Sequence, residues 1–216
     1  MLRFVVPAML ALSLTGCGAI GYSLTANLPS SGTPTGKSPR VKTAAASSSG
    51  FRTKVDAAVA EDDKAPRGSF EKASRGALSD RDYNATKLDA ELARDLVNAY
   101  RKEKGLRPLR LQPNLTEAAR THSRDLAKWD RISHFGSDGS NPWDRVKRAG
   151  YNAKLAAENV GTGQASIQEV IKGWKGSPGH NKNLLLSDAE HMGIALVKDP
   201  KTEFKTFWTL VVASPM

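Results

Sequence analysis

Large apolar residues are sparse over residues 18–85 of this 216-residue chain, whereas residues 86–216 are rich in them. The earlier segment consists mainly of Ser, Thr, Gly, Ala, Pro and charged residues. Such a segment cannot bury enough apolar surface to offset the entropy that is lost on ordering, so we expect residues 17–85 to form a disordered tether. Residues 86–216 have the length of one domain with a single core.

The N-terminus has the pattern of an export signal. Arg3 precedes an apolar run over residues 4–14, which is shorter than the roughly 20 residues needed to span a bilayer. The run ends in an LTGC motif that resembles a bacterial lipobox, in which small residues precede the cysteine that receives the lipid. We therefore expect residues 1–16 to be cleaved and Cys17 to carry lipid, such as palmitate.

Cys17 is the only cysteine of the chain. A disulfide within the monomer is therefore excluded, and a thiolate metal site would need more sulfur ligands. Lipidation explains this residue better than an ordinary signal peptide with an incidental cysteine does, because a free exported thiol is prone to oxidation. Gly18 follows, and no Asp stands there to indicate retention in the inner membrane. We expect an extracytoplasmic protein, on the outer membrane if the cell has one.

The chain is basic, with a formal net charge of +10 at pH 7. From residue 86 onward, 21 Lys and Arg are scattered among 15 Asp and Glu without a basic stripe, which argues against nucleic acid as a partner. Anionic lipids or cell-envelope polymers suit an exported protein better. Residues 18–55 carry only basic charges, which either touch headgroups near the anchor or are simply solvated. As a flexible coil, the tether would span on the order of 45 Å.

Helical periodicity predicts two long helices at the start of the domain. Apolar residues recur at helical spacing over residues 88–100, with Thr86 and Asp89 as a capping pair and Gly105 as the stop signal. The same spacing recurs over residues 113–129, where Pro opens a second helix.

Three shorter helices are indicated by their caps. Asn141 followed by Pro opens one helix, and Gly150 closes it. Ser166 and Glu169 have the spacing of a capping box for the next, and Ser177 followed by Pro is the cap of a third.

Strands are interspersed with these helices and end the chain. Residues 154–161 have the pattern of one strand, and residues 191–198 and 204–213 alternate on either side of a turn, as in an antiparallel hairpin. Helices first, with strands between them and last, give an α+β domain.

Three motifs carry candidate functional side chains. They are Ser-His-Phe around His134, Ala-Glu-Asn-Val around Glu158, and a run over residues 169–180 that contains Trp174 and ends in Ser-Pro-Gly-His. In order and spacing they resemble the CAP superfamily, the secreted domains shared by cysteine-rich secretory proteins, insect venom allergens, plant pathogenesis-related proteins and bacterial SCP-like proteins.

The resemblance implies an α-β-α sandwich over residues 86–216. It also implies a cleft on which four side chains converge: His134, Glu158, Glu169 and His180. Two departures from the family pattern stand out. Asn181 occupies a position where bacterial relatives usually have Arg, and the cysteines that staple eukaryotic members are absent. The core must then be held by four tryptophans: Trp129, Trp143, Trp174 and Trp208.

Two imidazoles and two carboxylates could hold a divalent ion, with zinc the best match and His134 and His180 the first candidate ligands. They could also share protons as an acid–base pair, or simply satisfy one another as a polar cluster. Glu169 has a local explanation as well, because the third position of a capping box favours Glu. His122, on the apolar face of the second helix, is interpreted as a core-facing, hydrogen-bonded imidazole that lies near the site at most.

Two classes of function follow. In the first, a monomeric domain binds a divalent ion, a lipid, another small molecule or an envelope polymer in the cleft; eukaryotic CAP proteins bind sterols and lipids. In the second, a hydrolase acts on envelope peptide or polymer with a metal-bound water, or with Glu158 or Glu169 as the base. No nucleophile stands out, because Ser133 only adjoins His134 in sequence and Ser177 is explained as a cap. We therefore favour a binding module over an enzyme.

Overall fold

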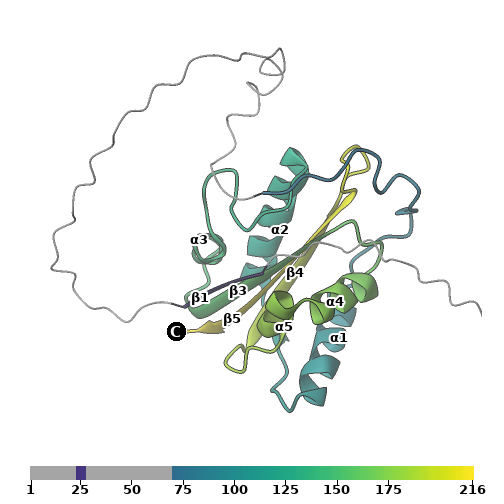
Figure 1. The fold of residues 1–216 in the computed structure, drawn as a ribbon. Coiled ribbons are helices and arrows are strands. Elements are labelled where there is room, and N and C mark those ends of the chain that lie inside the picture. The colour runs from purple at the N-terminus through teal and green to yellow at the C-terminus, as the bar shows by residue number, and fades with distance from the viewer. Residues whose placement is uncertain (1–22, 28–69) are drawn as a thin grey trace, which may run out of the picture.

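The structure is a computed structural model that describes residues 23–27 and 70–216 (Figure 1). For Ser23–Asn27 it describes the backbone. The expected signal peptide over residues 1–16, the candidate lipidation residue Cys17 and most of the expected tether lie outside the described residues. The described part of the domain begins at Phe70, earlier than the expected boundary.

A five-stranded mixed sheet forms the centre of the domain, in the order β1-β3-β5-β4-β2. Its three long strands are β3 (Ala153–Thr162), β4 (His191–Lys198) and β5 (Thr206–Pro215), and β5 pairs antiparallel with both neighbours. They confirm the predicted strand and hairpin to within two residues. The short edge strands β1 (Ser23–Asn27), antiparallel to β3, and β2 (Arg110–Leu111), parallel to β4, lie where the sequence analysis expects no strand.

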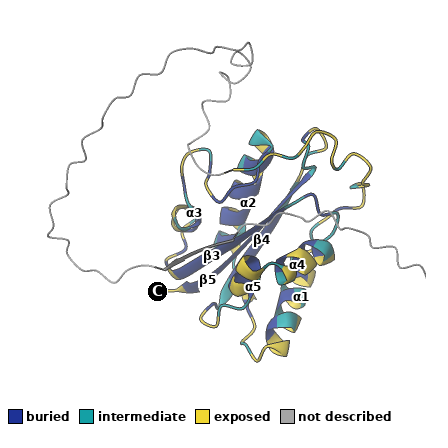
Figure 2. Ribbon diagram, viewed as in Figure 1, coloured by how far each residue is buried: buried dark blue, intermediate teal, exposed yellow. Residues whose placement is uncertain are grey.

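Five helices cover the two faces of the sheet. They are α1 (Ala90–Glu103), α2 (Pro113–Trp129), α3 (Pro142–Arg148), α4 (Ile167–Gly176) and α5 (Pro178–Leu184). Helices α2 and α3 lie on one face, and α1, α4 and α5 lie on the other (Figure 1). The strands are buried between these layers, while the helices expose their outer sides (Figure 2). The α+β class and the α-β-α sandwich are confirmed. In the described part of the chain, no helix has the length and apolar character that crossing a bilayer requires.

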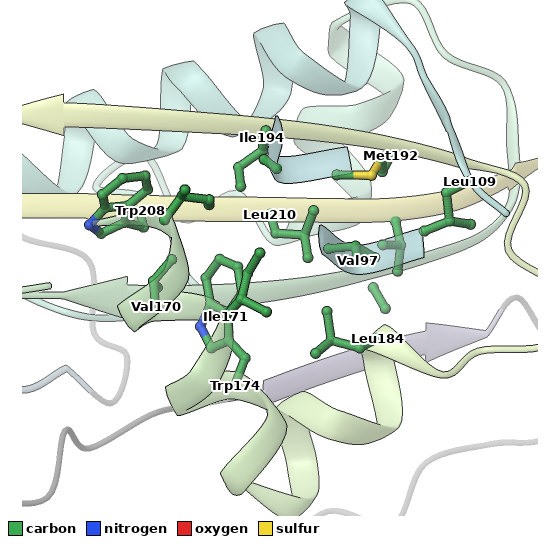
Figure 3. Close-up of a cluster of buried hydrophobic side chains, with 14 of the residues drawn as sticks. Val97, Leu109, Val170, Ile171, Trp174, Leu184, Met192, Ile194, Trp208 and Leu210 are labelled. Carbon is green, nitrogen blue, oxygen red and sulfur yellow. The ribbon is translucent and has the colours of Figure 1, made fainter. Parts of the chain in front are cut away.

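The strands contribute to both layers, because successive residues of a strand point to opposite faces. On β5, Leu210 belongs to the apolar cluster under α1, α4 and α5, whereas Val211 belongs to the cluster under α2 and α3. Ile194 and Ala195 divide in the same way on β4. Figure 3 shows the first cluster, in which Trp174 on α4 packs toward the sheet. Both faces of the sheet therefore rest on a core of their own.

Three of the four tryptophans contribute to the core as expected. Trp174 and Trp208 are 3% and 0% exposed, and each indole N–H donates a hydrogen bond to a backbone carbonyl. Trp143, the second residue of α3, is half-buried and packs against the apolar cluster under α2 and α3. The expectation is wrong for Trp129, which is half-buried at the end of α2 and belongs to none of the described clusters.

The predicted caps are confirmed for one helix and differ in detail for two others. Asn141 forms a reciprocal capping box with Asp144 at the start of α3. The predicted cap of α1 by Thr86 is wrong, because Asp89 accepts the capping hydrogen bond instead. Ser177 stands at the N-cap of α5, but its side chain makes no capping hydrogen bond.

Residues 70–85, which the sequence analysis assigns to the tether, lie against the domain and are called the strap below. An isolated antiparallel bridge joins the start of the strap to the loop after α2. The hydroxyl of Tyr83 donates to the carbonyl of Gly163 at 2.8 Å. Leu78 packs on the same glycine, where an added Cβ would lie 2.6 Å from Leu78 Cδ1. The expectation of a disordered tether is therefore wrong for this segment, because the bridge at Glu71, the hydrogen bond of Tyr83 and the half-buried side chain of Leu78 hold it against the domain.

We expect the strap to resist proteolysis in the full chain. Trypsin cleaves after Lys and Arg, and the strap offers Lys72, Arg75 and Arg81 as sites. Local opening must precede cleavage of a held segment, so limited digestion should leave a fragment that begins at Gly68 rather than at Asp82. Mass spectrometry of the fragment distinguishes the two.

Leu78→Ala provides the internal control. It removes the side chain that packs on Gly163, so cleavage within the strap should become several-fold faster. A wild-type fragment that begins at Asp82 would contradict the docking of the strap.

Candidate functional site

The side chain of Glu158 is the centre of a buried polar cluster. It stands on β3, on the same face as Ala156 and Val160, and is 1% exposed. The Nδ1 atom of His134 lies 2.9 Å from Glu158 Oε1, and Arg145 Nη2 donates to Oε2 at 2.7 Å. Two of the four expected site residues, His134 and Glu158, are therefore in direct contact.

The carboxyl of Glu158 is ionised at neutral pH. Burial opposes the charged form, but the Arg145 guanidinium and the hydrogen bond from His134 outweigh this effect and hold the pKa of the Glu158 carboxyl well below its usual range. An ionised carboxylate only accepts hydrogen bonds, so His134 carries a proton on Nδ1 and donates it. The Nε2 atom of His134 then has a free lone pair when the ring is neutral, and no described residue bonds to it.

His122 supports the cluster from α2. Its ring is fully buried, and its Nε2 donates to the carbonyl of Ser133 at 2.8 Å. The same nitrogen lies 3.5 Å from Glu158 Oε1. Burial lowers the pKa of His122 to about 4 in spite of the nearby carboxylate, so the ring is neutral at pH 7. The interpretation of His122 as a core-facing, hydrogen-bonded imidazole near the site is confirmed.

Arg145 is the member of the cluster that the sequence analysis misses. It lies on α3, is 4% exposed, and also donates to the carbonyls of Ser140 at 2.7 Å and His134 at 3.0 Å. The sequence does contain a signal for it. The buried residues of α3 are Pro142, Arg145 and Val146, so the arginine is on the apolar face of its helix. A charge in that position is too costly to leave unpaired and implies a buried acid.

Asn159 points to the opposite face of β3 and holds α5 in place. Its Nδ2 donates to the carbonyl of His180 at 3.1 Å. Asn183 Nδ2 in turn donates to Asn159 Oδ1 at 2.9 Å and to the carbonyl of Glu158 at 3.0 Å. The Glu-Asn pair of the motif thus fixes one layer of the sandwich on each face of the sheet.

Asn181, which stands where bacterial relatives usually have Arg, joins α5 to α1. Its Oδ1 accepts a hydrogen bond from the hydroxyl of Tyr100 at 2.8 Å. A neutral contact between helices therefore occupies this position.

His180 lies in the first turn of α5 and is 1% exposed. Neither of its ring nitrogens has a hydrogen-bond partner among the described residues. Burial, with a smaller contribution from nearby His134, lowers the pKa of His180 to about 4, so the ring is neutral at pH 7 and offers one N–H and one lone pair. His134 and His180 approach β3 from opposite faces, and each has hydrogen-bonding capacity that the protein does not use.

Glu169 is not part of this cluster. It lies in the first turn of α4, where its N–H donates to Ser166 Oγ at 3.2 Å and its Oε2 accepts from the N–H of Ala165 at 2.8 Å. Arg81 of the strap donates to both carboxylate oxygens at 2.7 Å. The capping position is confirmed, although the carboxylate bonds Ala165 rather than the cap residue. Glu169 lines a cavity of about 390 Å³ beneath the strap and does not converge with Glu158.

The donors at the cluster do not fit a divalent metal ion. Residues 23–27 and 70–216 contain no group of three His, Cys, Asp or Glu that could hold one, whereas zinc sites use three or four protein ligands. Among the four expected ligands, Glu158 and Glu169 are each paired with an arginine, which leaves the imidazoles of His134 and His180. The four expected ligands therefore do not form the expected zinc site.

Comparison with known proteins identifies relatives of the domain. The pattern described as "CAP: Cysteine-rich secretory protein family" matches residues 94–212. The uncharacterized protein YkwD of Bacillus subtilis (strain 168) is 35% identical over 115 residues, which are 53% of this chain and 43% of that protein. The uncharacterized membrane protein YlbC of the same organism is 30% identical over 102 residues, which are 47% of this chain and 30% of that protein. The chain thus spans less than half the length of these curated relatives.

Solved structures agree with this result. An extracellular protein from Bacillus anthracis that contains an SCP domain superposes with a TM-score of 0.51 at 25% identity, over 57% of this chain and 39% of that one. An outer surface protein from Borrelia burgdorferi superposes with a TM-score of 0.54 at 19% identity, over 60% of this chain and 98% of that one. The second likeness concerns the fold alone.

Removing one partner of the buried ion pair should be costly. In Arg145→Met, Glu158 remains buried but loses the charge that compensates it, and such a change typically costs about 3–5 kcal/mol. We expect urea unfolding of the full chain to show a loss of this size. Arg148→Met is the matched control, because Arg148 pairs with Asp138 at the surface from the same helix. Exposed pairs contribute about 0–1 kcal/mol.

The double variant Arg145→Met/Glu158→Gln should recover part of the lost stability, since no charge then remains buried. If Arg145→Met cost no more than Arg148→Met, the ion pair would not be what holds the cluster.

Proposed function

Because the chain belongs to the CAP cysteine-rich secretory protein family, we propose that it is an extracytoplasmic binding module, anchored to a membrane by lipid on Cys17. Two observations support this location: the relative from Bacillus anthracis is described as extracellular, and the LTGC motif has the lipoprotein pattern. The protein acts as a monomer, on the outer membrane where the cell has one.

The unpaired imidazoles carry the proposal. His180 is almost completely buried, yet both of its ring nitrogens lack a protein partner, and the same is true of His134 Nε2. Buried polar atoms are normally hydrogen-bonded, and leaving one unpaired costs about 1–3 kcal/mol. A ligand that bonds to these atoms would relieve this cost. The binding site is therefore placed where His134 and His180 flank β3.

Binding is favoured over hydrolysis by the state of the two carboxylates. A general base works best when its pKa lies near the operating pH. The pKa of Glu158 is held far below that range by Arg145, and Glu169 is bound by Arg81. Glu158 is then unsuited to take a proton from water, and both oxygens of Glu169 already accept hydrogen bonds from Arg81.

The unpaired ring nitrogens indicate the chemistry of the ligand. His180 is neutral at pH 7 and offers one donor and one acceptor, and His134 Nε2 is a further unpaired polar atom, which suits hydroxyl and amide groups. Cell-envelope polymers carry many such groups, whereas the tail of a lipid would leave the ring nitrogens unpaired. We therefore place an envelope polymer ahead of a sterol or lipid, and ahead of a metal ion, for which the ligand set is incomplete.

His180→Phe tests the site most directly. Phe retains the bulk of the ring but forms no hydrogen bonds, and the His180 ring has no protein partner to lose. The free energy of unfolding should therefore not fall, because Phe also removes the cost of the two unpaired nitrogens, which is about 1–3 kcal/mol for each buried unpaired group. Binding of the full chain to purified insoluble cell-wall polymer, measured by cosedimentation, should weaken about tenfold, the equivalent of about 1.4 kcal/mol.

His191→Phe is the matched control, because His191 lies at the start of β4 and contacts the hydroxyl of Tyr151 at 2.7 Å. Its polymer binding should equal that of the wild type. Should His180→Phe also bind like the wild type, the imidazole pair would not be the site. Stoichiometric zinc binding that His134→Ala abolishes would favour the metal site instead.

The anchor has its own test. Because lipid transfer requires the thiol of Cys17, Cys17→Ser should leave the membrane fraction or accumulate as the uncleaved precursor. Gel mobility and fractionation report both outcomes. A variant that stays in the membrane fraction at the mature size would rule out the lipid anchor.

A further inference from the structure

The outer edge of β3 is covered by a strand that is distant in the sequence. Strand β1 pairs antiparallel with β3 over five residues, with Ser23 opposite Asn159 and Asn27 opposite Leu155. The other four strands all lie within residues 110–215. Without β1, β3 would be the edge of the sheet (Figure 1).

An uncovered β3 would be an interaction surface. The strand is ten residues long and consists mainly of small or apolar residues. Long, apolar edges attract other strands, so proteins normally shorten, charge or cover them. Extended peptides also bind in this way, by adding a strand to an open edge: main-chain hydrogen bonds give affinity and alternate side chains give specificity.

Strand β3 contacts the segments that carry both imidazoles. His134 contacts Glu158 on one face of β3, and Asn159 bonds to the carbonyl of His180 on the other. Residues directly opposite each other on paired strands share a face. A residue of an added strand that stands opposite Glu158 is therefore on the side of His134, and its neighbour opposite Asn159 is on the side of His180. Helix α5 also contacts β1.

We propose that the outer edge of β3 is a docking site for one extended polypeptide strand, that Ser23–Asn27 is its resident occupant, and that an extended peptide of the cell envelope binds there by displacing it. The choice of this ligand class rests on the proposed binding site at His134 and His180. The pairing of a strand with β3 does not depend on that site.

The connection between β1 and the strap makes displacement reversible. It consists of 42 residues, 28–69, for which the sequence predicts a flexible coil with an end-to-end distance on the order of 35 Å. A segment tethered by such a coil has an effective concentration on the order of 1 mM. The resident strand therefore excludes dilute, weak peptides and yields to those that bind more tightly.

Docking of β1 also shortens the stretch of chain between Cys17 and the domain. Cys17 is six residues from Ser23, a length that an extended chain spans in at most about 20 Å. Residues 18–69 as a free coil would span on the order of 40 Å. The domain is thus held close to the membrane while β1 is docked, and gains reach when an external peptide replaces it.

The double variant Leu24→Pro/Thr25→Pro tests the resident strand. Successive N–H groups of a strand point to opposite sides, so one of the two prolines removes a donor that faces β3. Amide hydrogen exchange over residues 155–159 of the full chain should become at least tenfold faster. Thr43→Pro/Ala44→Pro, outside the strand, is the matched control and should leave exchange unchanged. Tryptophan fluorescence melting should be the same in all three, because the core lies within residues 70–216.

A fluorescent synthetic peptide of residues 22–28 tests the site in trans. It should bind the strand-proline variant at least tenfold more tightly than the wild type, and it should restore slow exchange over residues 155–159. Unchanged exchange in the proline variant, or a peptide that binds neither protein, would overturn the proposal. Loss of wild-type protection on dilution would also overturn it, because a second copy would then supply the strand.

The tests of the strand site can succeed or fail independently of the polymer-binding test of the proposed function. His180→Phe should weaken peptide binding to the strand-proline variant without changing hydrogen exchange in the absence of peptide. Peptide binding that His180→Phe leaves unchanged would preserve the strand site and count against the imidazoles, whereas failure of the proline test would leave the polymer-binding result for His180→Phe intact.

Discussion

The buried ion pair between Glu158 and Arg145 is the interaction on which the rest of the site depends. Removing two charges from water is costly, and the cost is offset only where the geometry is good and the remaining donors are paired. Both terminal nitrogens of Arg145 are paired, because they also donate to the carbonyls of Ser140 and His134, which fixes the loop between α2 and α3; its Nε has no partner among the described residues. The pair thereby joins β3, α3 and that loop into one unit and sets the position of the His134 ring.

The same pairing decides which chemistry remains available. A carboxylate whose charge is neutralised inside the protein is a poor metal ligand and a poor base, so Glu158 organises the site without offering itself to a ligand. Nitrogens without a hydrogen-bond partner remain on the imidazoles instead, at His134 Nε2 and at both ring nitrogens of His180. Since Asn159 bonds to the backbone carbonyl of His180 from the other face, β3 contacts both segments that carry these imidazoles.

The elements that the sequence predicts well are those with a strong local signal. Strand β3 and the hairpin of β4 and β5 show alternation, helices α1 and α2 show helical spacing, and the cap at Asn141 is formed by residues three apart. The contacts that it does not predict join residues far apart in the chain. Arg81 is separated from Glu169 by 88 positions, so neither residue reveals the pairing that removes Glu169 from the expected tetrad. Arg145 is intermediate, because its place on an apolar helix face is visible in the sequence but its partner is not.

Strand β1 is the extreme case of such a distant contact, and it explains why the edge beside the imidazoles is covered at all. Residues 94–212, which match the family pattern, contain β3 but no strand for its outer side. An edge of this length and apolar character must be blocked or used. Five residues with little apolar content can block it because the strand pairs mainly through its backbone, and for the same reason a peptide of different sequence can take its place. Because β1 pairs with β3 through its backbone, it covers the edge of β3 and can also be replaced by a peptide strand. Both properties are needed if the edge of β3, beside the unpaired imidazoles, is a binding site.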